Sequence, residues 1–168
     1  MAAETEGPKA LTKNPLGPTG EAVAANVERL RNDQHLTFAA LAERLSEIGR
    51  PIPTLGLRKI VNQSRRVDAD DLVALAVALD VSPISLLMPA SSSQEEPVRA
   101  TGVSGEPEAG ELWDWLRGWE TLGRQSLVGY FLRAWPAWFQ ETYLVEKVEQ
   151  FQKRQGEHIR RRRAEKGL

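Results

Sequence analysis

The sequence predicts an all-α protein made of two helical units that differ in composition. Apolar residues recur with the helical period along residues 21–89 and again along residues 111–168. The first stretch contains one aromatic residue, Phe38, whereas the second contains ten of the eleven aromatic residues, including all five tryptophans. Cores of such different composition indicate two units that each bury their own apolar faces.

Two segments lack the large apolar residues from which a core is built. Residues 1–20 contain three prolines and three glycines, and residues 90–110 are rich in Ser, Gly, Glu and Pro. Such segments cannot bury enough surface to offset the entropy lost on ordering. We therefore expect a flexible tail over residues 1–20 and a linker over residues 90–110.

Five short helices are predicted in residues 21–89. Thr37 is placed to cap the second helix and Gly49 to end it. A proline-containing turn leads into a short third helix over residues 54–61, and Asp68 and Ser82 begin the fourth and fifth helices. The residues expected to point inward are Val23, Val27, Leu30, Phe38, Leu41, Ala42, Leu45, Ile48, Leu57, Ile60, Val61, Leu72, Leu75, Ala76 and Leu79.

About three further helices are expected in residues 111–168, which form a Trp-rich unit. The second of them should span roughly residues 124–135, with Leu127, Val128, Phe131 and Leu132 as its apolar face. Pro136 fits the first turn of the third helix. A unit of this size has a marginal core, so we expect it to bury apolar surface in a homodimer or against a partner protein. The alternative is that the tryptophans fill a core within the chain.

A cluster of four arginines, Arg160–Arg163, makes the end of the chain locally basic. Three interpretations stay open for this tip. It is a solvated terminus, a contact to DNA phosphates, or a contact to an acidic partner.

Composition excludes several kinds of chemistry. The net charge of −1 argues against a uniformly basic coat for nucleic acid, and the absence of cysteine removes disulfides and thiolate sites. The two histidines, His35 and His158, lie far apart in the sequence and in no recognisable motif. We therefore expect no metal, no cofactor and no enzymatic activity. Without a signal peptide or an apolar run of membrane-spanning length, the chain is expected to be cytoplasmic.

Three strings in the first unit resemble the lambda-repressor-like helix-turn-helix family of the xenobiotic-response-element type. They are LTFAALAERLSEIGRPI, LRKI and RRVDADDLVALAVALDVSPISLLMP, and the likeness covers residues 23–89, about 40% of the chain. The resemblance implies a five-helix domain that binds double-stranded DNA, with the helix over residues 54–61 in the major groove. It implies a bacterial or phage transcriptional regulator, in the form of a repressor.

The resemblance also implies which residues contact DNA. Thr54, Leu55 and Arg58 would face the bases, with Arg58 placed to bond two acceptors of guanine. Contacts to the phosphates would come from Thr37, Lys59, Asn62, Gln63, Ser64, Arg65 and Arg66. Arg65 and Arg66 could equally well pair with the aspartates of the fourth helix.

This chain departs from the family pattern at several positions. Pro53 stands where a serine usually opens the reading helix, and Gly56 lies inside that helix. Val61 and Gln63 replace the usual Glu and Gly, and Phe38 replaces a glutamine that often contacts DNA. These changes leave fewer hydrogen-bonding groups on the reading face.

The alternative function is therefore a protein–protein interaction module whose working surface is the Trp-rich unit. Self-cleavage at Ala109-Gly110 is not expected, because the residues that follow are too few and too helical for a peptidase domain.

Overall fold

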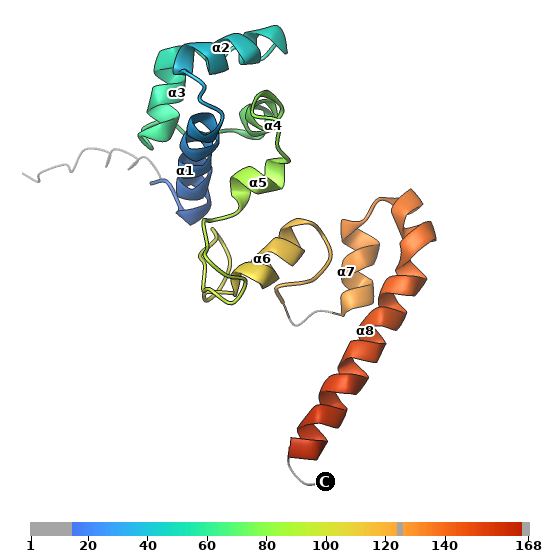
Figure 1. Cartoon of the computed structure of the whole chain (residues 1–168). Coiled ribbons are helices and arrows are strands. Elements are labelled where there is room, and N and C mark those ends of the chain that lie inside the picture. Colours follow the sequence, from blue (N-terminus) through green and yellow to red (C-terminus); the bar gives the residue numbers. More distant parts are fainter. Residues whose placement is uncertain (1–14, 124–125, 166–168) are drawn as a thin grey trace, which may run out of the picture. The chain divides into compact units, whose positions relative to one another are not determined.

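The computed structural model describes residues 15–123 and 126–165, which form eight helices and no strand (Figure 1). The fold of these residues is all-α, as the helical period predicts. Two compact units are present. The N-terminal unit is Met1–Ala90 with Arg99–Gly102, and the C-terminal unit is Ser91–Val98 with Val103–Leu168.

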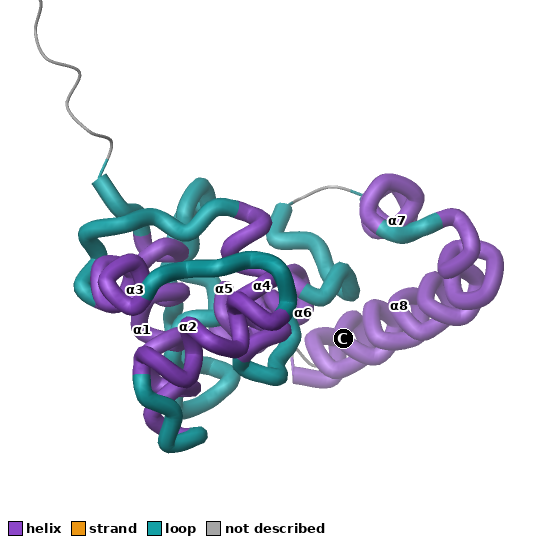
Figure 2. Tube along the Cα trace, turned by 90° about the horizontal axis from the view of Figure 1, so that it is seen from above, coloured by secondary structure: helices purple, strands orange, loops and turns teal. Residues whose placement is uncertain are grey.

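The five helices of the N-terminal unit follow the predicted order. They are α1 (Pro18–Asp33), α2 (Phe38–Glu47), α3 (Thr54–Val61), α4 (Ala69–Ala78) and α5 (Pro83–Leu87). Helix α1 packs against α3 and α5, while α2 packs against α3 and α4. Figure 2 shows α1, α2 and α3 as neighbouring tubes in this unit. The bounds of α3 match the predicted residues.

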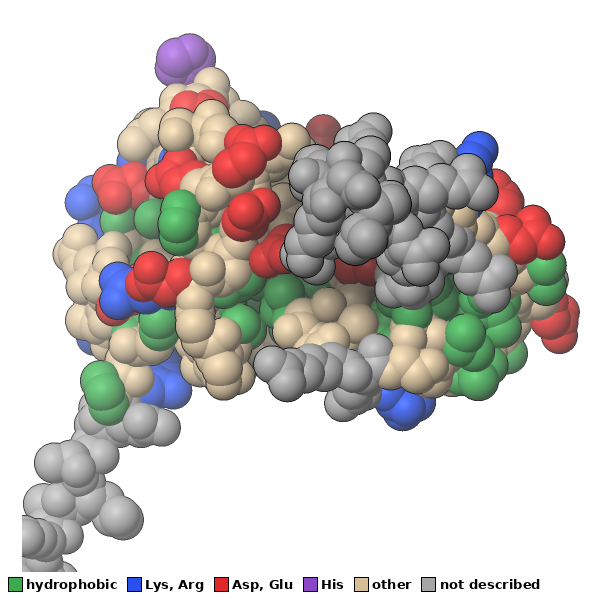
Figure 3. Space-filling model, turned by 90° about the horizontal axis from the view of Figure 1, so that it is seen from below, with side chains coloured by type: hydrophobic (Ala, Val, Ile, Leu, Met, Phe, Trp, Pro, Cys, Tyr) green, Lys and Arg blue, Asp and Glu red, His purple; other side chains and the backbone are tan. Residues whose placement is uncertain are grey.

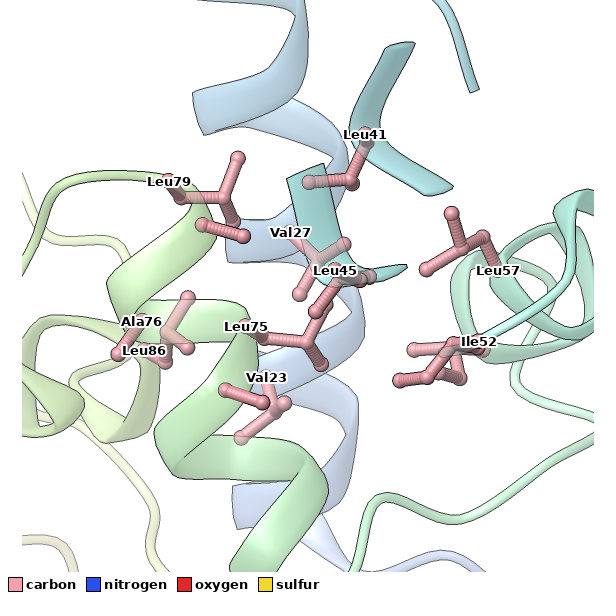
Figure 4. Close-up of a cluster of buried hydrophobic side chains, with 13 residues drawn as sticks. Val23, Val27, Leu41, Leu45, Ile52, Leu57, Leu75, Ala76, Leu79 and Leu86 are labelled. Atoms are coloured by element: carbon pink, nitrogen blue, oxygen red, sulfur yellow. The ribbon is translucent and has the colours of Figure 1, made fainter. Parts of the chain in front are cut away.

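The core of the N-terminal unit is aliphatic and receives side chains from all five helices (Figure 4). Val27 of α1, Leu45 of α2, Leu57 of α3, Leu75 of α4 and Leu86 of α5 are completely buried. Burying a side chain of this size contributes about 1.5–3 kcal/mol. Shared burial on this scale holds α2 and α3 against the rest of the unit.

Local sequence signals explain where the helices of this unit begin and end. The Thr37 hydroxyl accepts a hydrogen bond from the Ala40 N–H at 3.1 Å, and the Asp68 carboxylate accepts one from the Asp71 N–H at 2.7 Å. Gly49 has φ +78°, the left-handed conformation that glycine adopts without steric cost. Both predicted caps and the predicted stop are thus confirmed.

Ile48 is a correction to the predicted core. Its helical spacing from Leu41 and Leu45 places it on the buried face of α2, yet 44% of its surface is exposed. The reason is local, because Ile48 is the C-cap of α2 and has left the helical register. The spacing of apolar residues does not predict that α2 ends at Glu47, one residue before Ile48.

Both segments predicted to lack structure are partly folded. Helix α1 begins at Pro18, so the expected tail contributes its last three residues to that helix, while residues 1–14 lie outside the described part. Residues 90–110, the expected linker, contain turns, an isolated bridge between Pro97 and Glu108, and the buried Val98. Backbone hydrogen bonds replace the missing apolar contacts, including Val98 N–H to the Pro107 carbonyl.

The C-terminal unit contains α6 (Ala109–Leu116), α7 (Leu127–Ala134) and α8 (Ala137–Glu165). Its small core centres on the stacked rings of Phe131 and Trp135, whose centroids are 4.1 Å apart. Trp119 and Phe139 meet the Trp135 ring edge-on. The Trp135 indole N–H donates to the Gly118 carbonyl at 2.6 Å, so the polar atom of the ring is satisfied.

The apolar face predicted for α7 divides in two. Leu127 and Phe131 are buried, whereas Val128 and Leu132 are 39% and 54% exposed. Helix α7 has a described neighbour in α8, which covers one stripe of its surface.

The side chains of residues 151, 152 and 154–165 are outside the described part, so the basic tip Arg160–Arg163 lies there too. Across the described residues, no helix combines the length and the apolar character needed to cross a bilayer.

Candidate nucleic-acid interface

Helix α3 has one buried face and one open face within the N-terminal unit. Leu57 and Ile60 are buried in the core, whereas Leu55 is 64% exposed and the side chains of Arg58 and Lys59 are also exposed. Of the residues predicted to face bases, Leu55 and Arg58 are therefore exposed, and Thr54 is half-buried. The helix thus presents an apolar group and two cations outward.

The turn before α3 is held by the core rather than by a cap. Ile52, at 2% exposure, anchors the turn among the buried residues. Pro53 is the N-cap of α3 and makes no side-chain hydrogen bond to it, as its chemistry dictates. Helix α3 therefore begins without a side-chain cap, and burial of Ile52 fixes where it starts.

The polar loop after α3 is exposed at its first three residues. Asn62, Gln63 and Ser64 all lie at the surface, and Gln63 has φ +59°. The backbone N–H groups of Ser64 and Arg65 both donate to the Lys59 carbonyl, and the Ser64 hydroxyl donates to the same oxygen at 3.2 Å. These bonds close the end of α3 and place the three exposed side chains beside it.

Arg65 and Arg66 both have partners within the N-terminal unit, although Arg66 is exposed. The Arg65 guanidinium pairs with the Asp71 carboxylate at 2.7 Å, which is the acidic partner that the sequence left open. Arg66 Nη2 donates to the Pro15 carbonyl at 2.6 Å. The structure therefore separates this pair from Lys59, which the sequence had grouped with it as a phosphate contact.

Asp71 is the centre of a charged network in which sequence reasoning offered Arg65 as a partner but missed Arg50. This carboxylate is only 3% exposed, and it accepts from Arg50 Nε at 2.9 Å through Oδ1 and from Arg65 Nη2 through Oδ2. Arg50 also pairs with Asp68 at 3.3 Å. The network ties the turn before α3 and the loop after α3 to the first turn of α4, so it fixes both ends of α3.

Gly56 is the residue in the sequence that could have indicated this network, because it leaves room for the Arg65 side chain. A Cβ built at Gly56 would lie 2.6 Å from Arg65 Nη1, closer than real Cβ contacts. The glycine inside α3 costs helix propensity, but it opens the space through which Arg65 reaches Asp71. The glycine at this position of α3 therefore has a structural explanation.

The network shifts the pKa values of two exposed groups. The side-chain hydrogen bond to Asp71 raises the pKa of the Arg50 guanidinium, with smaller contributions from the nearby carboxylate charges. The Asp71 N–H bond to the Asp68 carboxylate lowers the pKa of Asp68, and the Arg50 charge adds to that effect. Both shifts favour the charged forms.

Phe38 lies beside two arginines at the start of α2. The Arg31 Cζ is 4.2 Å from the centroid of the Phe38 ring, and the Arg58 Cζ is 4.8 Å from it. Both distances are within the range of cation–π contacts. Phe38 thus places an aromatic ring next to the exposed Arg58 of α3.

Charged side chains of both signs are spread over the surface. Figure 3 shows a face of the molecule on which acidic and basic groups are interspersed rather than gathered into one basic patch. Among the described residues, no group of three or more His, Asp or Glu side chains is arranged to hold a metal ion.

Comparison of the chain with protein-family models, with curated protein sequences and with solved structures finds no match.

Proposed function

We propose that the chain is a sequence-specific DNA-binding transcriptional regulator, in the form of a bacterial or phage repressor. In this proposal α1–α5 are a lambda-repressor-like domain, and α3 enters the major groove of double-stranded DNA while α2 crosses the backbone. The support from the structure is the short exposed helix α3, which follows α2 after a tight turn and is braced by the core at Leu57 and Ile60.

One observation carries the proposal, and it concerns the eight cations of residues 21–89. Six of them hold hydrogen bonds or ion pairs inside the unit: Arg29, Arg31, Arg44, Arg50, Arg65 and Arg66. Within the described residues, Arg58 and Lys59 have neither an ion pair nor a hydrogen bond. Of these eight cations, the two left for an external anion are therefore adjacent on the open face of α3.

Each exposed residue has a role in this proposal. Arg58 bonds the O6 and N7 atoms of a guanine, and Leu55 makes an apolar contact with a thymine methyl group. Lys59 and the exposed loop residues Asn62 and Gln63 contact phosphates. Thr37 adds a phosphate contact through its hydroxyl hydrogen, since the oxygen already accepts from Ala40.

The remaining predicted contacts are reassigned. Arg65 pairs with Asp71 and the exposed Arg66 donates to the Pro15 carbonyl, so in this proposal both stabilise the chain around the loop rather than binding phosphates. The Ser64 hydroxyl hydrogen is engaged by the Lys59 carbonyl. The proposed interface is consequently smaller than the sequence implies, and Arg58 carries more of its specificity.

The test is selection of duplexes from a random pool by the full chain, followed by affinity measurement on the selected duplex. Arg58→Ala should weaken binding by about 10-fold or more, because a bidentate contact to guanine is worth about 1–3 kcal/mol. Arg99→Ala is the matched control, since it removes the same charge from an exposed residue of the same unit. Equal affinities for the wild type and Arg58→Ala would contradict the proposal.

A protein-interaction function has separate support in the C-terminal unit. Large apolar side chains remain exposed there, led by Val145 at 71% and Trp138 at 69%. Exposed aromatic residues of this kind are typical of binding surfaces. Sedimentation of the full chain tests a homodimer: a dimer that Trp138→Ala dissociates supports it, and a monomer at all concentrations excludes it. Leu55→Ala, at a similarly exposed position of the other unit, is the control.

A further inference from the structure

The ring of Phe38 is fixed in place by the N-terminal unit. Phe38 is the first residue of α2, directly after the Thr37 cap, and its half-buried side chain packs against the aliphatic core. A residue capped on one side and packed on the other has little rotamer freedom. The ring is therefore a rigid surface at the edge of the proposed DNA interface.

The two arginines beside this ring differ in how firmly they are held. Arg31 donates to the Leu36 carbonyl and to the Asn32 side chain, both at 2.6 Å, so its guanidinium is bound on two edges. Arg58 makes no such bond among the described residues, and its contact with Phe38 is the interaction that the structure gives it. Phe38 is thus the group that limits where the Arg58 guanidinium lies.

Contact with an aromatic face suits an arginine that must read a base. The ring contacts the guanidinium through its π-system and uses none of the N–H donors. Two parallel N–H donors stay available to bond guanine O6 and N7, and the side chain loses less freedom when it binds. A glutamine at position 38 would add hydrogen-bonding groups but would offer no ring to restrict Arg58 in this way.

We propose that Phe38 is a positioning residue for Arg58, and that it converts a flexible arginine into a preorganised reader of guanine. The inference rests on the proposed function, because it assigns a specificity role within that same DNA interface. In this proposal Phe38 makes no hydrogen bond to DNA itself, and it contributes to specificity by orienting Arg58.

The first arm of the test needs no DNA. Protons attached to the Arg58 side chain should resonate upfield in the free wild-type chain because they lie over an aromatic ring. In Phe38→Leu this shift should disappear, whereas Phe38→Tyr, which keeps the ring, should retain it. Absence of the shift in the wild type, or its persistence in Phe38→Leu, overturns the inference.

The second arm measures binding to a selected duplex in which each guanine is replaced in turn by 7-deazaguanine, which lacks the N7 acceptor. For the wild type, one replacement should weaken binding about 10-fold. In Phe38→Leu the penalty at that guanine should fall to about 2-fold, and Phe38→Tyr should keep it. A merely structural role would weaken binding to all duplexes equally and leave the penalty unchanged.

Failure of the two proposals can be told apart. If the wild type selects no duplex but shows the Phe38-dependent shift, the proposed function and the base-reading role are overturned together while the ring contact stands. If the wild type binds DNA, and the 7-deazaguanine replacement weakens binding of the wild type and of Phe38→Leu by the same factor at the same guanine, the positioning role alone is overturned.

Discussion

The N-terminal unit and the C-terminal unit bury their apolar residues in different ways. In the N-terminal unit, aliphatic side chains from five helices are completely buried around Leu75. In the C-terminal unit, the helical core is a stack of aromatic rings centred on Phe131, and large residues such as Trp138 stay exposed. Large apolar side chains are exposed in both units, including Leu55 and Val77 in the first and Trp138 and Val145 in the second. The two units therefore differ in the chemistry of their cores, which is aliphatic in the first and aromatic around Phe131 in the second.

Charged residues show the same contrast. Asp71 of the N-terminal unit is buried between two arginines, while the Arg117–Asp114 pair of the C-terminal unit is exposed on both sides. Buried pairs specify one arrangement of the chain, and exposed pairs contribute little. We infer that the N-terminal unit is built to hold α3 in one position, and that the surface of the C-terminal unit is suited to contacts made by burial.

The largest expected effect tests whether the two cores are separate. Leu75→Ala should destabilise the N-terminal unit by about 2–5 kcal/mol, because it leaves a cavity in a completely buried position. All five tryptophans lie in the C-terminal unit, so their fluorescence reports that unit alone. Far-UV circular dichroism reports the helices of both units. Its N-terminal component should therefore move to lower denaturant while the fluorescence transition stays.

The control for this prediction is Leu55→Ala. Leu55 is 64% exposed, so this substitution should change the free energy of unfolding by less than about 0.5 kcal/mol. Phe131→Ala should do the reverse of Leu75→Ala and move the fluorescence transition. If Leu75→Ala moves both transitions together, the two units do not unfold separately.

A smaller effect is expected from the charged network of the N-terminal unit. Asp71→Asn keeps the shape of the side chain but removes its charge and one of its two acceptors for arginine. The expected loss is about 1–3 kcal/mol, since both arginines are partly exposed and regain water. Urea unfolding measures it, and Asp70→Asn, with an 82% exposed side chain in the same helical turn, should change little. Equal effects of the two substitutions would contradict the network.

The smallest effect is a pH dependence caused by Asp68. Its folded-state pKa is lowered by the Asp71 N–H bond, so its charge stabilises the fold above its unfolded-state pKa of about 3.9. That contribution is lost as pH falls through the lower folded-state value. Asp68→Asn keeps a cap acceptor without titrating there, so the stability difference from wild type should be largest near neutral pH and shrink in acid. A difference independent of pH would contradict this assignment.

Local signals in the sequence predicted much of the fold. Thr37 and Asp68 cap helices as expected, and Gly49 ends α2 with a positive φ. These predictions held because a cap or a stop depends on a few adjacent residues. The exposure of Ile48 and the backbone hydrogen bonds within residues 90–110 were not predicted, for the opposite reason: these features depend on where the chain turns and on which backbone groups it meets.

The candidate site was only partly predictable. The exposure of Leu55 and Arg58 follows from the helical period of α3, which buries Leu57 and Ile60. The pairing of Arg65 with Asp71 does not follow from the helical period, because helix packing selects one carboxylate among several in the first turn of α4. The position of the Phe38 ring beside Arg58 is likewise a tertiary contact, and no spacing in the sequence encodes it.

The most direct test of α3 as the reading helix is methylation protection of guanine N7 on a selected duplex. The proposed contact of Arg58 occupies N7 in the major groove. We predict that the bound wild type protects at least one guanine, and that Arg58→Ala at saturating concentration leaves that guanine reactive while Arg99→Ala still protects it. A bound wild-type chain that protects no guanine N7, or protection that survives Arg58→Ala, would contradict the account.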